Sequence, residues 1–242
     1  SISVDGLNSG VISEASSTGR GGNITINAGQ SVSLNNNASI SASSTGTVAD
    51  AGNAGSISIN SAGNFESNGG RVSTTATQAQ GGDINITAGQ DIRLSNNASV
   101  SASSTGAGNA GNITAIAGDD FIMQNSSITT QATQASGGNI KIGAADQIVI
   151  QNSLVSASVM GGSGSGGNIS IDPNAVILQN SRILAQAVLG NGGNISIITP
   201  FFLADQASVI SASSQFGLSG TVTIQSPLSN LSGSLGTLSS KP

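Results

Sequence analysis

Short stretches in which apolar and polar residues alternate occupy most of the chain. The first clear set reads NITI at residues 23–26, SVSL at 31–34 and SISAS at 39–43, with Gly- or Asn-rich residues between them. Alternation with a period of two is typical of β-strands with one buried face. No stretch sustains the three- and four-residue spacing of an amphipathic helix. The pattern therefore predicts an all-β chain.

This set of three stretches returns along the chain. The residues that follow the glycine pair or its substitute are Asn23, Ser56, Asp83, Asn112, Asn139, Asn168, Asn194 and Thr221, about 28 residues apart. A repeat of this length with strand patterning indicates a solenoid, in which neighbouring coils bury each other. We expect a single parallel β-helix over residues 1–225, with three short strands per coil and seven to eight coils. Residues 1–20 supply a partial first coil, and residues 226–242 a frayed cap or linker.

Alternation also predicts the inward columns. The first strand contributes Ile24, Ile57, Ile84, Ile113, Ile140, Ile169, Ile195 and Val222, and then Ile26, Ile59, Ile86, Ile142, Ile171, Ile197 and Ile224. The second contributes Val32, Phe65, Ile92, Phe121, Ile148, Val176 and Phe202. The third contributes Ile40, Val72, Val100, Ile128, Val155, Ile183 and Ile210, followed by small residues from Ala42 to Ala212. In the fourth unit Ala115 replaces an isoleucine and Ile116 follows, which predicts a bulge.

Asparagines recur just after the second strand. They are Asn36, Asn96, Asn125, Asn152 and Asn180, with Asn68 one place early and Gln206 in the last unit. Asparagine tolerates a left-handed backbone, and stacked amides can bond from coil to coil. We expect a structural ladder of amides inside this turn.

Composition narrows the function. Only 7% of the residues are charged, the net charge is −5, and Cys, His, Trp and Tyr are absent. Disulfides, thiol nucleophiles, His-based catalysis and the usual zinc ligands are therefore excluded. The few cations are scattered, which argues against nucleic-acid binding. No apolar run approaches the ~20 residues of a membrane helix.

The carboxylates give a weak signal only. Asp91, Asp119 and Asp146 precede the second strand in successive coils and Asp120 is adjacent, so a cation site there is conceivable. A glycosidase or lyase needs clustered acids, usually with a base or calcium. We predict no catalytic, cofactor or metal site, and interpret these acids as solvated corners.

Two outer features could serve binding. Unit lengths differ mostly after the third strand, where the loops are rich in Gly, Ala, Ser and Asn. On the outward face of the third strand, hydroxyl side chains are expected to stack into a column that Leu184 interrupts, with Ser39, Ser99, Ser127, Ser43, Ser103 and Ser213 beside it. Such a face can contact glycans or order water, or simply be solvated. The candidate contact residues are Ser41, Ser73, Ser101, Thr129, Ser156 and Ser211.

The stretches GGNITI...GQSVSLNNNASISASS and GNAGNIT...DDFIMQNSSITTQA resemble the repeat region of filamentous haemagglutinin-type exoproteins of the two-partner secretion pathway, over about residues 1–225. The resemblance implies a right-handed β-helix and export, unfolded, through an outer-membrane partner transporter. It also implies a secreted or cell-surface role in adhesion, aggregation or biofilm formation, with host or neighbour-cell glycans or proteins as contacts. The secretion domain of that family is not identifiable, so the resemblance assigns this chain to the shaft or carboxy-terminal part.

The sequence thus predicts a structural and adhesive shaft. The alternatives are a polysaccharide-binding or polysaccharide-modifying β-helix, and a hydroxyl face that binds ice or glycans.

Overall fold

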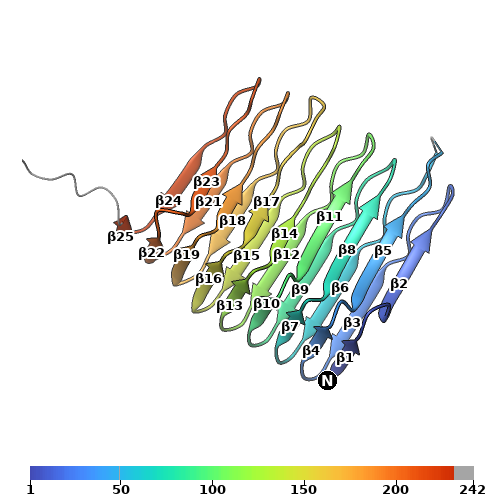
Figure 1. Cartoon of the computed structure of the whole chain (residues 1–242), viewed down its shortest axis with the longest axis horizontal. Coiled ribbons are helices and arrows are strands. Elements are labelled where there is room, and N and C mark those ends of the chain that lie inside the picture. Colours follow the sequence, from blue (N-terminus) through green and yellow to red (C-terminus); the bar gives the residue numbers. More distant parts are fainter. Residues whose placement is uncertain (49, 232–242) are drawn as a thin grey trace, which may run out of the picture.

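The computed structural model describes residues 1–48 and 50–231, and these residues form a parallel β-solenoid. Its strands line up in three parallel sheets that run the length of a rod (Figure 1). No helix occurs among the described residues. The solenoid has about eight coils of about 28 residues, as the repeat predicts.

Each sheet takes one strand from each coil. Sheet A consists of β1 (Ile2–Asp5), β4 (Val32–Asn35), β7 (Phe65–Asn68), β10 (Ile92–Ser95), β13 (Phe121–Gln124), β16 (Gln147–Gln151), β19 (Ala175–Gln179), β22 (Phe201–Ala204) and β25 (Leu228–Leu231). Sheet B consists of β2 (Gly10–Ala15), β5 (Ser39–Ser44), β8 (Arg71–Ala76), β11 (Ser99–Ser104), β14 (Ser127–Thr129), β17 (Leu154–Ser156), β20 (Arg182–Leu184) and β23 (Val209–Ser211). Sheet C consists of β3 (Ile24–Ala28), β6 (Ile57–Ser61), β9 (Ile84–Ala88), β12 (Ile113–Ala117), β15 (Ile140–Ala144), β18 (Ile169–Asp172), β21 (Ile195–Ile198) and β24 (Val222–Gln225).

The predicted inward columns form one continuous core, except that Val222 and Ile224 in the last strand of sheet C are 42% and 37% exposed, because they lie at the end of the stack. In sheet C, Ile113 pairs in register with Ile84 on one side and Ile140 on the other, and all three side chains are buried. Phe65 and Phe121 are fully buried in sheet A. The column of small residues from Ala42 to Ala212, which lie in the strands of sheet B or directly after them, is buried too. Stacked β-branched side chains suit a pleated sheet, which explains the excess of isoleucine.

The expected bulge in the fourth unit is wrong. Ala115 pairs directly with Ile86 and Ile142, so the register of β12 is unbroken. Ala115 takes an inward site, and Ile116 points outward, where its Cδ1 lies over Gly143 in the next coil. The missing side chain of Gly143 leaves room for Ile116. Alanine at this core position thus reduces the side-chain volume and leaves the pairing register unchanged.

The pairing also runs beyond the predicted end of the shaft at residue 225. Strand β25 pairs with β22, with Leu228 opposite Phe201 and Leu231 opposite Ala204. Part of the segment interpreted as a cap or linker therefore continues sheet A. The remaining residues of that prediction, 232–242, lie outside the described residues.

Glycines bring successive coils into close contact where the chain enters sheet C. The glycine two residues before each strand of sheet C stacks on its predecessor: Gly22, Gly55, Gly82, Gly111, Gly138, Gly167, Gly193 and Gly220. A Cβ built on Gly111 would overlap the carbonyl group of Gly82, and the same holds at the equivalent steps. These glycines are required by the small distance between backbones, because no positive φ is involved.

The residue after this glycine forms a ladder along the rod. Oδ1 of Asn112 accepts a hydrogen bond from the backbone N–H of Asn139 at 2.9 Å, and Oδ1 of Asn139 accepts one from Asn168 at 2.9 Å. The same bond joins Asn23 to Ser56, Asp83 to Asn112, Asn168 to Asn194 and Asn194 to Thr221. Side-chain oxygens thus satisfy the N–H groups that precede each strand of sheet C.

The loops from sheet B to sheet C project from one side of the rod (Figure 1). They span residues 16–23, 45–48 with 50–56, 77–83, 105–112, 130–139, 157–168, 185–194 and 212–221, and hold most of the length variation. Ala110, Ala132, Val159 and Ala187 form a second, small apolar cluster in these loops. The loops therefore pack on one another and extend the stacking of the coils outward.

Candidate functional site

The candidate contact face is the outward surface of sheet B. Strand pairing aligns Ser41, Ser73, Ser101, Thr129 and Ser156, then Leu184 and Ser211, so the predicted column exists as a register. Ile12 lies opposite Ser41 at the amino-terminal end. The structure thus brings all six candidate residues together in one line and places the interruption at Leu184.

Several of these hydroxyls bond to each other. Ser73 Oγ donates to Ser41 Oγ at 3.4 Å, and Thr129 Oγ1 donates to Ser101 Oγ at 3.3 Å. Ser156 Oγ donates to Ser158 Oγ at 2.9 Å. These bonds orient the hydroxyls, while each oxygen keeps further capacity to accept a bond.

The side chains of the hydroxyl column have little exposure to solvent. Ser73 is 8% exposed and Ser156 4% exposed, and the other members are half-buried. One flanking row contains Ser39, Ser99 and Ser127 as predicted, but the same register positions carry Arg71, Leu154, Arg182 and Val209 in other coils. These longer side chains break the expected flat polar face. A wide planar ligand therefore has less access to the hydroxyl column than a narrow polymer chain has.

A groove of about 460 Å³ runs beside this column, along the turn from sheet A to sheet B. Its lining repeats from coil to coil and includes Asn97, Asn125, Asn152, Asn180, Ser127 and Arg182. Asn125, Asn152 and Asn180 have φ of 47°, 47° and 46°. This left-handed backbone turns the chain sharply between the sheets. The groove extends along the rod, and its lining combines asparagine and serine side chains with apolar groups such as Ala98 and Leu154.

The expected ladder of turn asparagines is partly wrong. Asn96 donates to Asn68 at 2.8 Å and Asn180 donates to Asn152 at 2.8 Å, both between amide groups of neighbouring coils. However, the turn asparagines are exposed, so these bonds lie on the outside of the coil and not within it. In the second unit, Gly69 takes the left-handed position with φ of 72°. The longer ladder is the one that enters sheet C.

The alignment of the acids from coil to coil differs by one residue from the alignment expected for Asp91 and Asp119. Asp91 aligns with Asp120, since Asp91 Oδ1 accepts a bond from the Asp120 N–H at 3.1 Å. Asp119 aligns with Asp146 in the next coil, and the Asp146 N–H donates to the Asp119 carbonyl oxygen. Asp91 also forms an ion pair with Arg93 at 2.7 Å. Among the described residues, no three acids gather in a way that could hold a metal ion.

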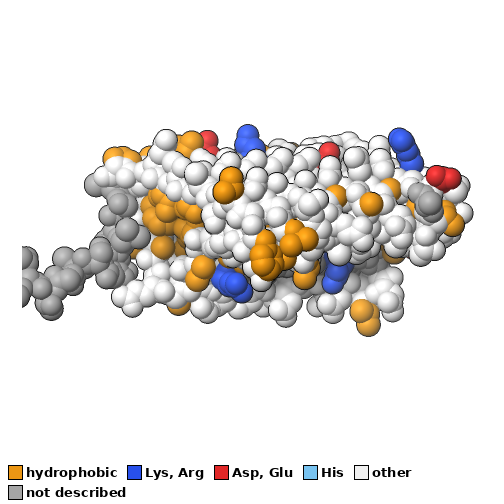
Figure 2. Space-filling model, turned by 90° about the horizontal axis from the view of Figure 1, so that it is seen from above, with side chains coloured by type: hydrophobic (Ala, Val, Ile, Leu, Met, Phe, Trp, Pro, Cys, Tyr) orange, Lys and Arg blue, Asp and Glu red, His pale blue; other side chains and the backbone are white. Residues whose placement is uncertain are grey.

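Charge is sparse elsewhere on the rod. Figure 2 looks onto the loops from sheet B to sheet C and shows charged side chains that stand singly on a largely uncharged surface. Residues 1–48 and 50–231 contain no helix of the length and apolar character needed to cross a membrane.

Sequence reasoning found the hydroxyl column but missed the groove. The sequence carries a signal for the groove, because Asn97 follows the turn residue Asn96, and the groove lining repeats an asparagine in each later coil. Comparison of the chain with family models, with curated proteins and with solved structures finds no match.

Proposed function

We propose that this chain is the structural and adhesive shaft of a secreted or surface-exposed haemagglutinin-like adhesin, and that it has no catalytic role. One observation carries the proposal: the same registered coil repeats along the described chain, with an aliphatic core and a Ser-, Thr- and Asn-rich exterior. Each coil adds about 4.8 Å of length. Such a rod can hold a contact surface away from a cell.

Export as an unfolded chain through an outer-membrane partner transporter belongs to this proposal. The absence of Cys fits that route, because no disulfide has to form or be undone during passage.

A second candidate function is binding of a glycan chain. The groove favours it, because asparagine and serine groups repeat along the axis beside the hydroxyl column. Amides and hydroxyls both donate and accept hydrogen bonds, as sugar hydroxyls do. A polymer that lies along the rod could contact several coils at once.

Adhesion can be tested with beads that carry the purified protein, applied to glycan arrays and to cell layers. A pair of lysines at Ser101→Lys and Thr129→Lys places charge on the hydroxyl column. The control pair, Thr25→Lys and Ser58→Lys, adds the same charge at paired outward positions of sheet C.

If a glycan binds through sheet B, beads that carry the Ser101→Lys/Thr129→Lys variant should no longer bind, and beads that carry the control variant should still bind. A plain shaft predicts equal retention for both pairs. If coated beads bind no surface at all, the adhesive part of the proposal is wrong.

A further inference from the structure

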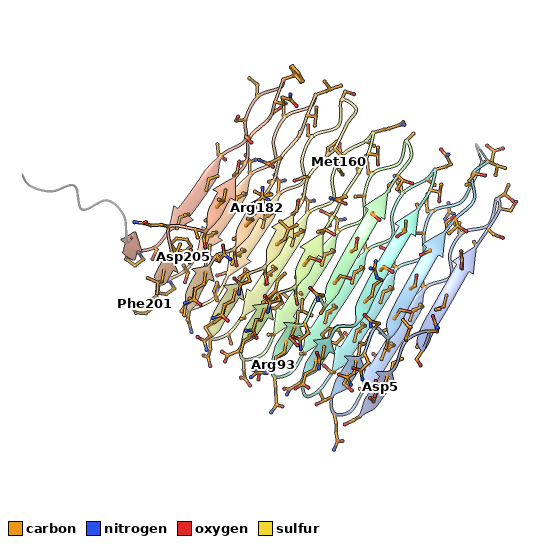
Figure 3. All side chains as sticks on the ribbon, in the orientation of Figure 1. Asp5, Arg93, Met160, Arg182, Phe201 and Asp205 are labelled. Carbon is orange, nitrogen blue, oxygen red and sulfur yellow. The ribbon has the colours of Figure 1, made fainter. Side chains whose placement is uncertain are left out.

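The outward face of sheet A changes character halfway along the rod. One register position in its strands holds, in order, Ser3, Ser33, Glu66, Arg93, Ile122, Val149, Ile177 and Leu203. The first four residues are polar or charged, the next four are aliphatic, and Asn230 of β25 follows Leu203 in the register. Figure 3 shows Arg93 and Phe201, which lies two residues before Leu203, along this side of the rod.

These aliphatic side chains point away from the core. Ile122, Val149 and Ile177 are half-buried and alternate with fully buried residues along their strands, while Leu203 is 45% exposed and Phe201 55% exposed. The sheet A patch is defined as Ile122, Val149, Ala175, Ile177, Phe201 and Leu203. It places one of only five phenylalanines of the chain in solvent.

A row of glutamines borders the sheet A patch. Gln124, Gln151 and Gln179 are in register, and Gln151 Nε2 donates to Gln179 Oε1 at 2.6 Å. None of the outward residues of β13, β16, β19 and β22 is charged. A flat parallel sheet with an aliphatic row beside a glutamine ladder has the surface chemistry of paired sheets in steric zippers.

We propose that the sheet A patch binds a second copy of this chain, with the two rods side by side and antiparallel. The side chains of the patch recur at the strand spacing of about 4.8 Å. A second parallel sheet with the same spacing can interdigitate with them along the whole row, and another copy provides that sheet. The inference goes beyond the shaft function, because it concerns association between rods in solution.

Charge favours the antiparallel arrangement. A parallel pair would bring Glu66 of one rod to Glu66 of the other, and Arg93 to Arg93, and like charges in contact oppose association. A two-fold axis between β16 and β19 instead places Val149 opposite Ile177 of the second copy, and Ile122 opposite Leu203. The aliphatic row is then its own complement, as a two-fold contact requires.

The size of the patch predicts a weak contact. Four strands of about five residues cover roughly 19 Å by 16 Å, or about 300 Å² per copy. Stable interfaces bury about 800 Å² per partner. Association should therefore appear only at high protein concentration.

Sedimentation velocity on the whole chain over a range of concentrations tests the proposal. We expect the sedimentation coefficient to rise with concentration for the wild type, and the double variant Val149→Lys/Ile177→Lys to weaken association about tenfold or more. Arg93 occupies the same column one coil before Ile122 and two coils before Val149, so long cations fit this position. The control variant Thr25→Lys/Ser58→Lys adds equal charge on sheet C and should associate like the wild type. Equal behaviour of both double variants overturns the proposal.

Cysteine variants test the orientation and do not depend on the lysine variants. The chain has no cysteine, so Val149→Cys and Ile177→Cys each introduce a single thiol. Under mild oxidation, a mixture of the two variants should cross-link into mixed dimers, while each variant alone should cross-link poorly. Cross-linking of Val149→Cys chiefly with itself overturns the antiparallel arrangement. Binding of a polysaccharide by the patch without any self-association overturns the proposed partner.

Discussion

Gly111 lies so close to Gly82 of the preceding coil that a Cβ on Gly111 would overlap the Gly82 carbonyl group. The two glycines belong to a stack that recurs in each coil where the chain enters sheet C. The neighbouring atoms are backbone, which cannot rotate away as a side chain can. The coils can approach this closely only because neither residue has a side chain.

Replacement Gly111→Ala should separate two coils locally and lower the free energy of unfolding by about 2 kcal/mol or more. The matched control is Gly29→Ala, because a Cβ there meets no atom within 4 Å and the backbone is not left-handed. That variant should be neutral or slightly stabilising. Urea unfolding followed by circular dichroism measures both, and equal midpoints would contradict the proposed role of the glycine stack.

Substitution Ile140→Asp should unfold several coils, because it buries an unpaired carboxylate between Ile113 and Ile169. The expected loss is about 3–5 kcal/mol. Ser170→Asp places the same group on the outer face, opposite Lys141 in the next strand, and should change stability by less than about 0.5 kcal/mol. A soluble Ile140→Asp variant with wild-type stability would show that the inward column tolerates charge.

Two buried serines at one register position should respond in opposite directions to alanine. Ser44 and Ser104 both pair with Ala76, which shows that alanine fits there. Ser104 Oγ donates to the Ala79 carbonyl oxygen at 2.8 Å, whereas the buried Ser44 Oγ has no hydrogen-bond partner. Ser104→Ala should cost about 1 kcal/mol and Ser44→Ala should stabilise the fold by about 1 kcal/mol. Thermal unfolding of the two variants side by side checks the signs, and a loss of stability in both would argue that Ser44 is satisfied.

The carboxylate of Asp205 should make the stability of the fold depend on pH in the acidic range. Its pKa lies below the ordinary value, first because the Ser208 hydroxyl donates to it at 2.7 Å, and also because the backbone N–H groups of Asn180 and Ser208 do so. A lowered folded pKa means that this contribution to stability is complete above the unfolded pKa of about 3.9. It is lost as the pH falls through the lower, folded pKa.

Titration of the Asp205 carboxyl carbon by NMR measures this pKa directly. Ser208→Ala should raise it toward the ordinary range, because the largest stabilising bond to the charged form is removed. Asp205→Asn should remove its share of the pH dependence of unfolding. An unchanged pKa in Ser208→Ala would mean that the backbone donors alone hold it down.

The core could be predicted from sequence because one rule, alternation with a period of two, governs every strand. Ile57, Ile84 and Ile140 all lie where that rule places them. The rule failed at Ala115 because it assumed that each inward site needs a large side chain. The register is set by backbone pairing, and Gly143 makes room for the displaced bulk of Ile116.

Contacts between coils were harder to predict, because they depend on which residues stack. Asp91 aligns with Asp120 and not with Asp119, a shift of one position that the spacing alone does not reveal. The groove beside sheet B and the sheet A patch were missed for a related reason. Both are formed by outward residues. No single unit shows an unusual residue there, and the pattern becomes visible only when the residues of successive coils are aligned.

The ladder of Asn112, Asn139 and Asn168 has a direction. Each side-chain oxygen accepts from the coil that follows it in the sequence. A chain that winds up from its amino end therefore meets, at the start of every new coil, an acceptor already held in place by the finished one. Wound the other way, each arriving side chain would have to be ordered before its bond could form. The ladder therefore favours formation of the coils in the order of the sequence, from the first coil to the last.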